Sequence, residues 1–197
     1  MDLKHIPLEG RHVRLEPYAD ANREAVRRAL DVDPDGWSLF VRTGMGEHFD
    51  QWWSNAMEHQ ATGLFANYAV RRLSDGQIVG STSFLEISPA HSRVEVGATF
   101  LHPAVRSGAV NPESKRLLLA HAFDSGAVRV EIITDLRNLR SQAAIAKLGA
   151  VREGVLRKHK RTWSGYMRDT VVYSVIDDDW PAVRERLDAR LSAFQAV

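Results

Sequence analysis

Apolar residues follow two periods along the chain, and the period changes from one segment to the next. Alternating or continuous apolar runs predict strands at 12–16, 66–73, 77–87, 94–101, 128–134, 150–157 and 170–176. Apolar residues three and four positions apart predict helices at 20–30, 49–59, 111–124, 141–148 and 179–194, with Asp20 and Asp179 as the expected caps of the first and last. Residues 31–46 are rich in Gly and Pro, which predicts a loop.

The segment 93–124 is the part around which the other elements are arranged. An apolar, β-branched strand is followed by a turn of small residues and then by a helix. Asn111 is the expected N-cap and Pro112 the first helical residue, because proline loses no hydrogen bond there; Gly126 is the expected stop. A helix start preceded by small residues is suited to bind a phosphate, although every strand-turn-helix unit offers such a start.

The order of the predicted elements indicates the fold class. The strand-helix-strand step from Val94 to Val130 requires a parallel pair with a right-handed crossover, and the remaining strands look antiparallel. The prediction is an α/β (α+β) fold: a mixed, mostly antiparallel sheet with helices on both faces. No linker or repeat divides the chain, so residues 1–197 form a single predicted domain. Ligands of such sheets bind beyond the carboxyl ends of strands, near helix N-termini.

Composition narrows the function classes. The 197 residues are 44% hydrophobic and 26% charged with a net charge of +1, so a globular domain without a global attraction to nucleic acid is expected. The absence of cysteine suits a reducing cytoplasm. The first residues lack the apolar core of a signal peptide, and no apolar run approaches the ~20 residues of a membrane span. The eight histidines show no paired metal-ligand spacing, so no metal is expected.

Two local features each leave two interpretations. Trp37, Leu39 and Phe40 either pack beneath their loop or form part of an acceptor wall, and packing is the favoured interpretation. The basic run at 157–161 is either a nucleic-acid or ribosome contact or a solvated hairpin arm. The arm is favoured, because neighbouring residues on a strand point to opposite faces and so do not make one patch.

Several motifs carry a resemblance to a known family. The turn RSGAVN, the strand VRVEIITD and the run NLRSQAAIAKLGAVREG resemble the GCN5-related N-acetyltransferase (GNAT) superfamily. The Asn138-x-x-Ser141 pair followed by Lys147-Leu148-Gly149 and the stretch from Arg168 to Tyr173 resemble its Rim-type, ribosomal-protein N-terminal acetyltransferase branch. The resemblance covers about residues 10–180 and leaves out most of a C-terminal helix at about 179–194. It implies acetyl-CoA as donor, a primary amine as acceptor and a GNAT-like fold with a splayed parallel strand pair.

The resemblance also assigns the cofactor-binding residues. The family's pyrophosphate turn is a loose match here and falls on Arg106, Ser107, Gly108, Ala109, Val110 and Asn111. The splayed strands would be 94–101 and 128–134, with a bulge at Ala98-Thr99 around Gly97. The free backbone groups of Thr99, Phe100 and Leu101 would pair with pantetheine, and one N–H would polarise the thioester carbonyl. Asn138 matches a cofactor-contacting asparagine, and the alternative is a residue that holds its own turn.

The catalytic residues are expected on the same elements. An attacking amine must be neutral, so a base is needed, and Glu95 matches the position that carries it in some family members. The alternative for Glu95 is a solvated, arginine-paired carboxylate; Glu86 and Glu131 are weaker rivals. The family's tyrosine acid is replaced by Ile145, and Ser141 is the candidate proton donor to the thiolate as well as a candidate helix N-cap.

These residues lead to two functional hypotheses. The first is an N-acetyltransferase that works by direct attack in a ternary complex with acetyl-CoA and a primary amine, from a protein N-terminus to a small molecule. The second is a non-catalytic GNAT-like module that binds CoA or a protein partner. No membrane partner is expected, and the sequence leaves homodimer formation open.

Overall fold

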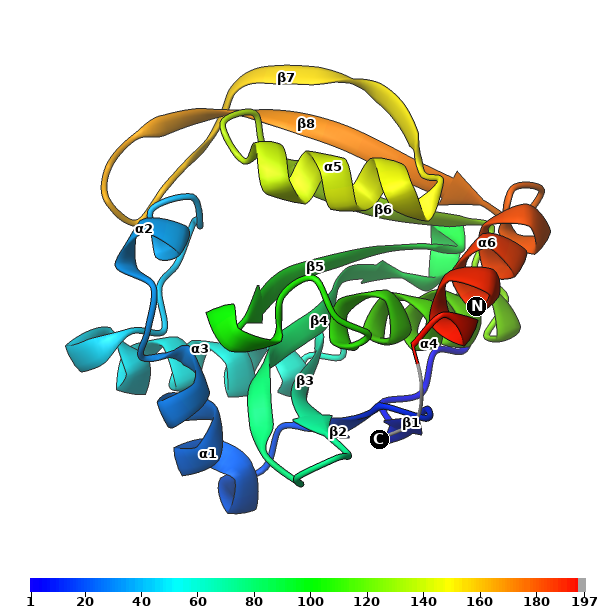
Figure 1. The fold of residues 1–197 in the computed structure, drawn as a ribbon. Coiled ribbons are helices and arrows are strands. Elements are labelled where there is room, and N and C mark those ends of the chain that lie inside the picture. The colour runs from blue at the N-terminus through cyan, green and yellow to red at the C-terminus, as the bar shows by residue number, and fades with distance from the viewer. Residues whose placement is uncertain (195–197) are drawn as a thin grey trace.

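The computed structural model describes residues 1–194 and contains one eight-stranded sheet with helices on both faces (Figure 1). The strands are β1 (Leu8–Glu9), β2 (Val13–Pro17), β3 (Ala66–Arg72), β4 (Ile78–Ser88), β5 (Arg93–Leu101), β6 (Arg129–Asp135), β7 (Val151–Arg161) and β8 (Met167–Ile176). The helices are α1 (Asp20–Leu30), α2 (Pro34–Trp37), α3 (Phe49–Ala61), α4 (Val110–Asp124), α5 (Leu139–Leu148) and α6 (Trp180–Ser192). The strand order is β1-β2-β3-β4-β5-β6-β8-β7, in which β5 and β6 are parallel and the other neighbours antiparallel. The predicted fold class is therefore confirmed.

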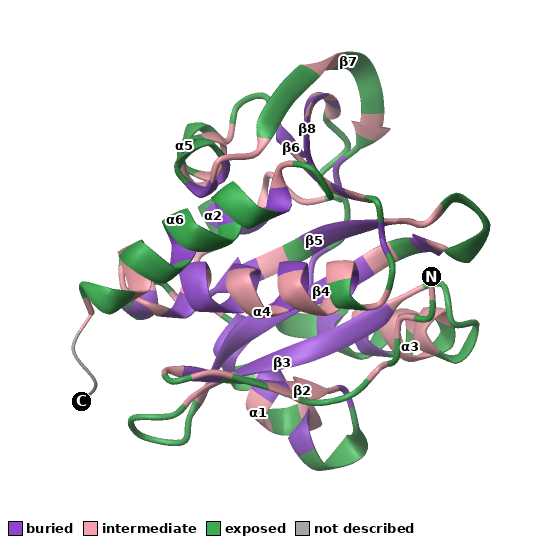
Figure 2. Cartoon of the chain, turned by 90° about the vertical axis from the view of Figure 1, so that its right-hand side faces the viewer, coloured by how far each residue is buried: buried purple, intermediate pink, exposed green. Residues whose placement is uncertain are grey.

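Two hydrophobic clusters hold the helices against opposite faces of the sheet. Neighbouring residues of β3 point to opposite sides, so Val70 belongs to the cluster beneath α4 and α6, and Ala69 to the cluster beneath α1 and α3. Leu118 and Leu119 of α4 are fully buried in the first cluster. Figure 2 shows the central strands, such as β3, largely buried, whereas the outer strand β7 is largely exposed. Burial of these apolar side chains is the main force that holds the layers together.

The parallel strands β5 and β6 pair over a short distance and then part. Their register joins Arg93–Glu95 to Arg129–Glu131 and no further residues. Beyond this point β6 continues beside β8, and β5 continues beside β4. The β4–β5 register shifts between Ser81 and Ser83, opposite Ala98, whose φ of 48° marks a bulge. The predicted splay and the predicted bulge are both confirmed.

Some predicted boundaries were wrong. Asn111 is not the cap of α4, because the helix begins at Val110 with Ala109 in the cap position. Proline is tolerated anywhere in a first turn, so Pro112 did not fix the start. Asp20 likewise lies inside α1, and its cap position is Ala19.

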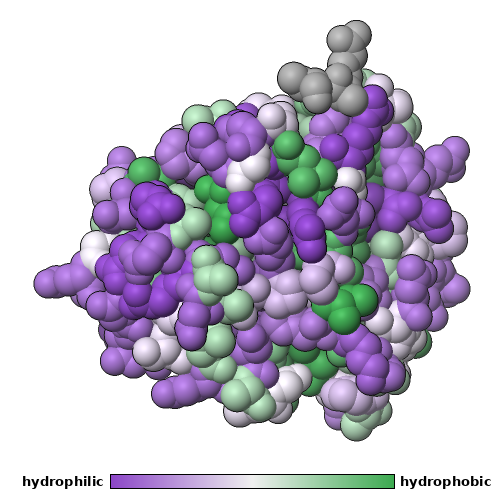
Figure 3. Space-filling model, turned by 90° about the horizontal axis from the view of Figure 1, so that it is seen from below, coloured by the Kyte–Doolittle hydropathy of each residue, from purple (hydrophilic) through white to green (hydrophobic). Residues whose placement is uncertain are grey.

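The last hairpin is longer than predicted, and two short elements were not predicted. β7 and β8 extend to Arg161 and from Met167, because charged residues pair there without the apolar alternation that marks a strand. β1 and α2 hold too few residues for a period to show. Within residues 1–194, no helix is long and apolar enough to cross a membrane. The face seen from below is mostly hydrophilic, with scattered apolar residues (Figure 3).

Candidate active site

A cavity of about 650 Å³ lies in the wedge between β5 and β6. Both strands line it, together with the turn before α4, the first turns of α4 and α5, and the segment of residues 36–42 at the end of α2 (the α2 segment). The edge of β5 that faces β6 is unpaired beyond Glu95, so those backbone groups of residues 99–101 that point to this edge are not used by the sheet. These residues were predicted to meet an extended ligand, and the structure brings them to the cavity wall.

The turn before α4 presents a row of free backbone donors. The N–H groups of residues 107–111 donate to no protein acceptor in the described part of the chain. Ser107 has a left-handed φ of 67°, and this bend just before a helix is typical of anion-binding concavities. The positive φ falls on Ser107 and not on Gly108, where a Cβ would meet only the Val105 carbonyl, at 3.7 Å. The free N–H groups and the positive end of the α4 dipole together suit the binding of a phosphate.

Cationic side chains also line the cavity. Arg140, Lys147 and Arg190 line it and come from α5 and α6, helices that are distant in sequence from α4. The sequence motifs did not predict these three residues as part of the site. Arg106, which it did identify, also lines the cavity but forms an ion pair with Asp33 and donates from Nε to the Leu101 carbonyl at 3.1 Å. Arg106 therefore braces the turn as well as adding positive charge.

Glu95 lies at the last paired position of β5 before the two strands part. It is 7% exposed and lines the cavity, and its carboxylate has no hydrogen bond or ion pair among the described residues. A Cβ at Gly97 would lie 2.7 Å from Glu95 Oε1, so this glycine leaves the carboxylate its space. Burial raises the pKa of Glu95; the positive charge of Lys160 opposes this rise, and the negative charge of Glu131 adds to it.

The two rival carboxylates are placed differently. Glu131 forms ion pairs with Arg129 at 3.1 Å and Arg93 at 3.5 Å, and it does not line the cavity. Glu86 lines the cavity from an exposed position on β4. Of these three acidic residues, Glu95 combines burial, an unpaired carboxylate and access to the cavity.

Lys115 is a buried ammonium group that the sequence-based search missed. Its side chain lines the cavity from α4, and Nζ donates to Thr99 Oγ1 at 2.7 Å. Burial lowers its pKa to about 7, and the negative charge of Glu95 opposes the decrease. A signal was present, since Lys115 precedes Leu118, Leu119 and Ala122 at spacings of three, four and seven and so belongs to the buried stripe of the helix.

The start of α5 contributes polar groups to the other side of the wedge. Asn138 is the N-cap: its Oδ1 accepts from the Ser141 N–H at 3.0 Å, which leaves its amide NH₂ as a free donor. The alternative of Ser141 as the cap is therefore wrong. The Ser141 hydroxyl makes no hydrogen bond within residues 1–194 and lines the cavity, as does the buried Ile145 that occupies the tyrosine position.

The aromatic residues near α2 are packed and also bound the cavity. Trp37 is 2% exposed and stacks on Phe100 with ring centroids 4.3 Å apart. The favoured interpretation of Trp37 as a packing residue is thus confirmed. Trp37, Leu39 and Phe40 also line the cavity. The α2 helix is tied to the turn before α4 by the ion pair between its cap Asp33 and Arg106.

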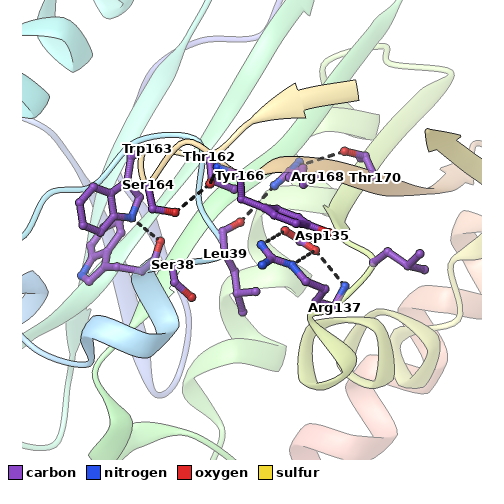
Figure 4. Close-up of polar contacts among 12 residues, drawn as sticks. Ser38, Leu39, Asp135, Arg137, Thr162, Trp163, Ser164, Tyr166, Arg168 and Thr170 are labelled. Carbon is purple, nitrogen blue, oxygen red and sulfur yellow. Dashed lines mark hydrogen bonds and ion pairs between the residues drawn. The ribbon is translucent and has the colours of Figure 1, made fainter. Parts of the chain in front are cut away.

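The β7–β8 hairpin reaches across to the α2 segment (Figure 4). Trp163 Nε1 donates to the Trp37 carbonyl at 2.9 Å, and Arg168 Nη1 donates to the Leu39 carbonyl at 3.3 Å. The basic run at 157–161 lies on the outer strand of this hairpin and is mostly exposed, as the hairpin-arm interpretation predicted. Lys160 is its exception, because it lines the cavity, as Arg168 does on the partner strand.

The chain is similar to known acetyltransferases in both sequence and structure. A family model described as an acetyltransferase (GNAT) domain matches residues 12–151. A proposed acetyltransferase from T. thermophilus is 40% identical over 94% of this chain and 96% of its own, with a TM-score of 0.84. A GCN5-related N-acetyltransferase from Brucella melitensis is 27% identical over 98% and 91%, with a TM-score of 0.87. Mycobacterium smegmatis RimJ, solved in complex with CoA-disulfide, shares the fold at 20% identity over 93% and 92%, with a TM-score of 0.78. No curated protein matches the sequence significantly.

Proposed function

The chain belongs to the GNAT acetyltransferase family, and from this premise we propose that it transfers the acetyl group of acetyl-CoA to a primary amine. The observation that carries the proposal is the joining of two features in one cavity: the free N–H groups of residues 107–111 and the unpaired carboxylate of Glu95. One suits a diphosphate, and the other suits an amine that must lose a proton. We assign the reaction to the cytoplasm, because the chain has no cysteine to oxidise.

The residues present fit acetyl-CoA. The diphosphate would accept from the row of backbone N–H groups, and Arg140, Lys147 and Arg190 would supply positive charge around the phosphates. The pantetheine arm would lie in the wedge, where its amides can replace the missing β-ladder between β5 and β6. Asn138 would donate its amide NH₂, which has no partner among the described residues, to the same arm. The bound molecule supplies the activated acetyl group as a thioester.

Glu95 would act as the base. An alkyl ammonium passes one proton to the carboxylate, directly or through a water, and the free nitrogen attacks the thioester carbon. The raised pKa of Glu95 makes the carboxylate a better proton acceptor near neutral pH than an exposed glutamate. A backbone N–H on the unpaired edge of β5 would stabilise the negative charge that develops on the carbonyl oxygen.

Ser141 would assist departure of the thiolate. The carbon–sulfur bond breaks as the carbonyl re-forms, and the second proton of the amine ends on sulfur, so the products are an amide and free coenzyme A. The Ser141 hydroxyl has no protein partner among the described residues and can donate to the sulfur. Because a thiolate is a fair leaving group, this contribution is expected to be smaller than that of Glu95.

The proposal is tested by thiol release from acetyl-CoA with a panel of amino acids, peptides, polyamines and aminoglycosides. The protein has no cysteine, so a thiol reagent reports only coenzyme A. We expect turnover with at least one amine, and a loss of about 10²- to 10⁴-fold in kcat for Glu95→Gln with unchanged CoA affinity. The control is Glu185→Gln, which removes an exposed carboxylate on α6 that does not line the cavity. CoA binding without thiol release from any amine would instead support the non-catalytic module.

A further inference from the structure

Arg168 is a buried guanidinium group that the proposed reaction does not use. It is 7% exposed on β8, yet it lines the cavity. Its Nε donates to Thr170 Oγ1 at 3.1 Å and its Nη1 to the Leu39 carbonyl at 3.3 Å (Figure 4). An arginine has five N–H donors, so most of its hydrogen-bonding capacity is unused. Its Nη2 makes no hydrogen bond and is not among the described polar atoms that are sealed from solvent, so this donor remains accessible on a side chain that lines the cavity.

No carboxylate among residues 1–194 forms an ion pair with Arg168. The nearby Asp135 is 1% exposed, but its oxygens accept from Arg137 at 2.7 and 3.1 Å and from the Arg137 N–H at 2.8 Å. Burial lowers the pKa of Arg168, and the negative charges of Asp135 and Glu95 oppose this decrease although neither carboxylate pairs with the guanidinium. An anionic ligand that pairs with Arg168 directly would recover the remaining cost of its burial. Lys160, the register partner of Arg168, adds a second positive charge on the same wall.

The guanidinium is held in place before any ligand arrives. Trp163 donates from its backbone N–H to the Phe40 carbonyl at 3.2 Å and from its indole to the Trp37 carbonyl, which ties the hairpin to the α2 segment. Arg168 itself bonds to the same segment. Because its neighbours already hold the planar guanidinium group in place, the group loses little conformational entropy when it binds a carboxylate.

The positive charges lie close to the proposed base. Both Lys160 and Arg168 favour the ionised form of Glu95, which means that their charges act across the cavity on that carboxylate. An acceptor whose amine approaches Glu95 would therefore bring any attached acidic group towards Arg168. A phosphate is less suited, because Glu95, Glu86 and Asp135 line the same cavity and repel a dianion more strongly.

We infer that Arg168, assisted by Lys160, binds a carboxylate of the acceptor, so that the substrate is a small amino acid rather than a polyamine or an aminoglycoside. The inference rests on the proposed function, because it assigns the acceptor to the same site. The amine of the amino acid meets Glu95, and its carboxylate accepts from the free N–H groups of Arg168. The aromatic residues of the α2 segment then bound the space for the side chain.

The test compares each of the common L-amino acids with its carboxamide and its decarboxylated amine, and adds O-phosphoethanolamine as the phosphate probe. We expect kcat/KM for the best free acid to exceed that of its amide by at least about 100-fold. In Arg168→Gln this ratio falls towards one, and Arg168→Lys restores part of it. Arg157→Gln, on the exposed strand of the same hairpin, keeps the ratio. Equal rates for acid and amide, or a preference for the phosphate probe, would overturn the inference.

Two further arms separate this inference from the transferase proposal. If no amine is acetylated, the same amino acids are titrated into CoA-loaded protein by calorimetry. Binding heat that requires the carboxylate of the amino acid and disappears in Arg168→Gln supports the carboxylate site even though the transferase proposal has failed. The absence of such carboxylate-dependent heat overturns the site. If Arg168→Gln does not fold, Lys160→Met takes its place, because Lys160 makes no bond to the α2 segment. An unchanged ratio of kcat/KM between acid and amide in Lys160→Met counts against the inference.

Discussion

Replacing Lys115 by methionine should stabilise the protein, and by an amount that depends on pH. Burial lowers the pKa of this lysine from 10.5 to about 7. Each tenfold change in the protonation equilibrium corresponds to about 1.4 kcal/mol. The charged lysine therefore reduces the free energy of unfolding by roughly 5 kcal/mol at pH 6, where both folded and unfolded chains carry the proton. Methionine has a similar length and no charge to desolvate.

The sign of the pH dependence follows from the direction of the shift. Between pH 7 and 10.5 the unfolded chain holds the lysine proton and the folded chain does not, so the stability of the natural protein rises with pH in this window. At pH 9.5 the remaining cost is about 1.4 kcal/mol. The stability advantage of Lys115→Met should thus shrink by about 3 kcal/mol between pH 6 and pH 9.5.

Urea unfolding of both proteins at the two pH values measures this change. Groups that titrate in both chains cancel in the difference, which isolates Lys115. Lys147→Met is the control, because it makes the same substitution at an exposed lysine on α5. An advantage of Lys115→Met that is the same at both pH values would refute the buried ammonium and, with it, the described packing of α4 against Thr99.

Three further predictions concern the cofactor turn, the base and the core. Gly108→Asp should weaken CoA binding at least about tenfold by calorimetry, because a carboxylate fits at this position without a clash and repels phosphate. In the control, Gly108→Ala, the CoA affinity should stay within about twofold of the natural protein. Equal CoA affinities of the two variants would argue against phosphate binding at the turn. Lys160→Met removes a charge that lowers the pKa of Glu95, so the acidic midpoint of kcat/KM should move to higher pH; a shift to lower pH would exclude Glu95 as the titrating base. Glu113 is buried and accepts three backbone N–H groups of residues 11–13, so Glu113→Ala should lower the free energy of unfolding by about 3–5 kcal/mol in urea, and a loss below about 1 kcal/mol would contradict these bonds.

The local patterns of the sequence predicted most of the sheet and its central irregularity. The apolar runs located the long strands, and the resemblance placed the bulge that the structure has at Ala98. The start of α4 was misplaced by two residues, because asparagine and proline fit several positions of a first turn. The ends of β7 and β8 were missed since their charged residues pair without alternating in polarity.

The candidate site was only partly predictable. Glu95 and the residues of the turn follow one another within a single strand-turn-helix unit, so a local motif could place them together. Lys115 was visible only as a charge within an apolar helical stripe. The clamp between Trp37 and Trp163 joins residues 126 positions apart, and no local pattern could bring them together. Arg168 acquires its role from that clamp, because the hairpin carries it into the cavity.

The crystal structure of the protein bound to coenzyme A is the most direct test of the central claim. We expect the diphosphate oxygens within about 2.7–3.2 Å of backbone nitrogens in residues 107–111, and the pantetheine arm between β5 and β6 beyond Glu95. A diphosphate bound elsewhere, or an arm that leaves the unpaired edge of β5 free, would contradict the account.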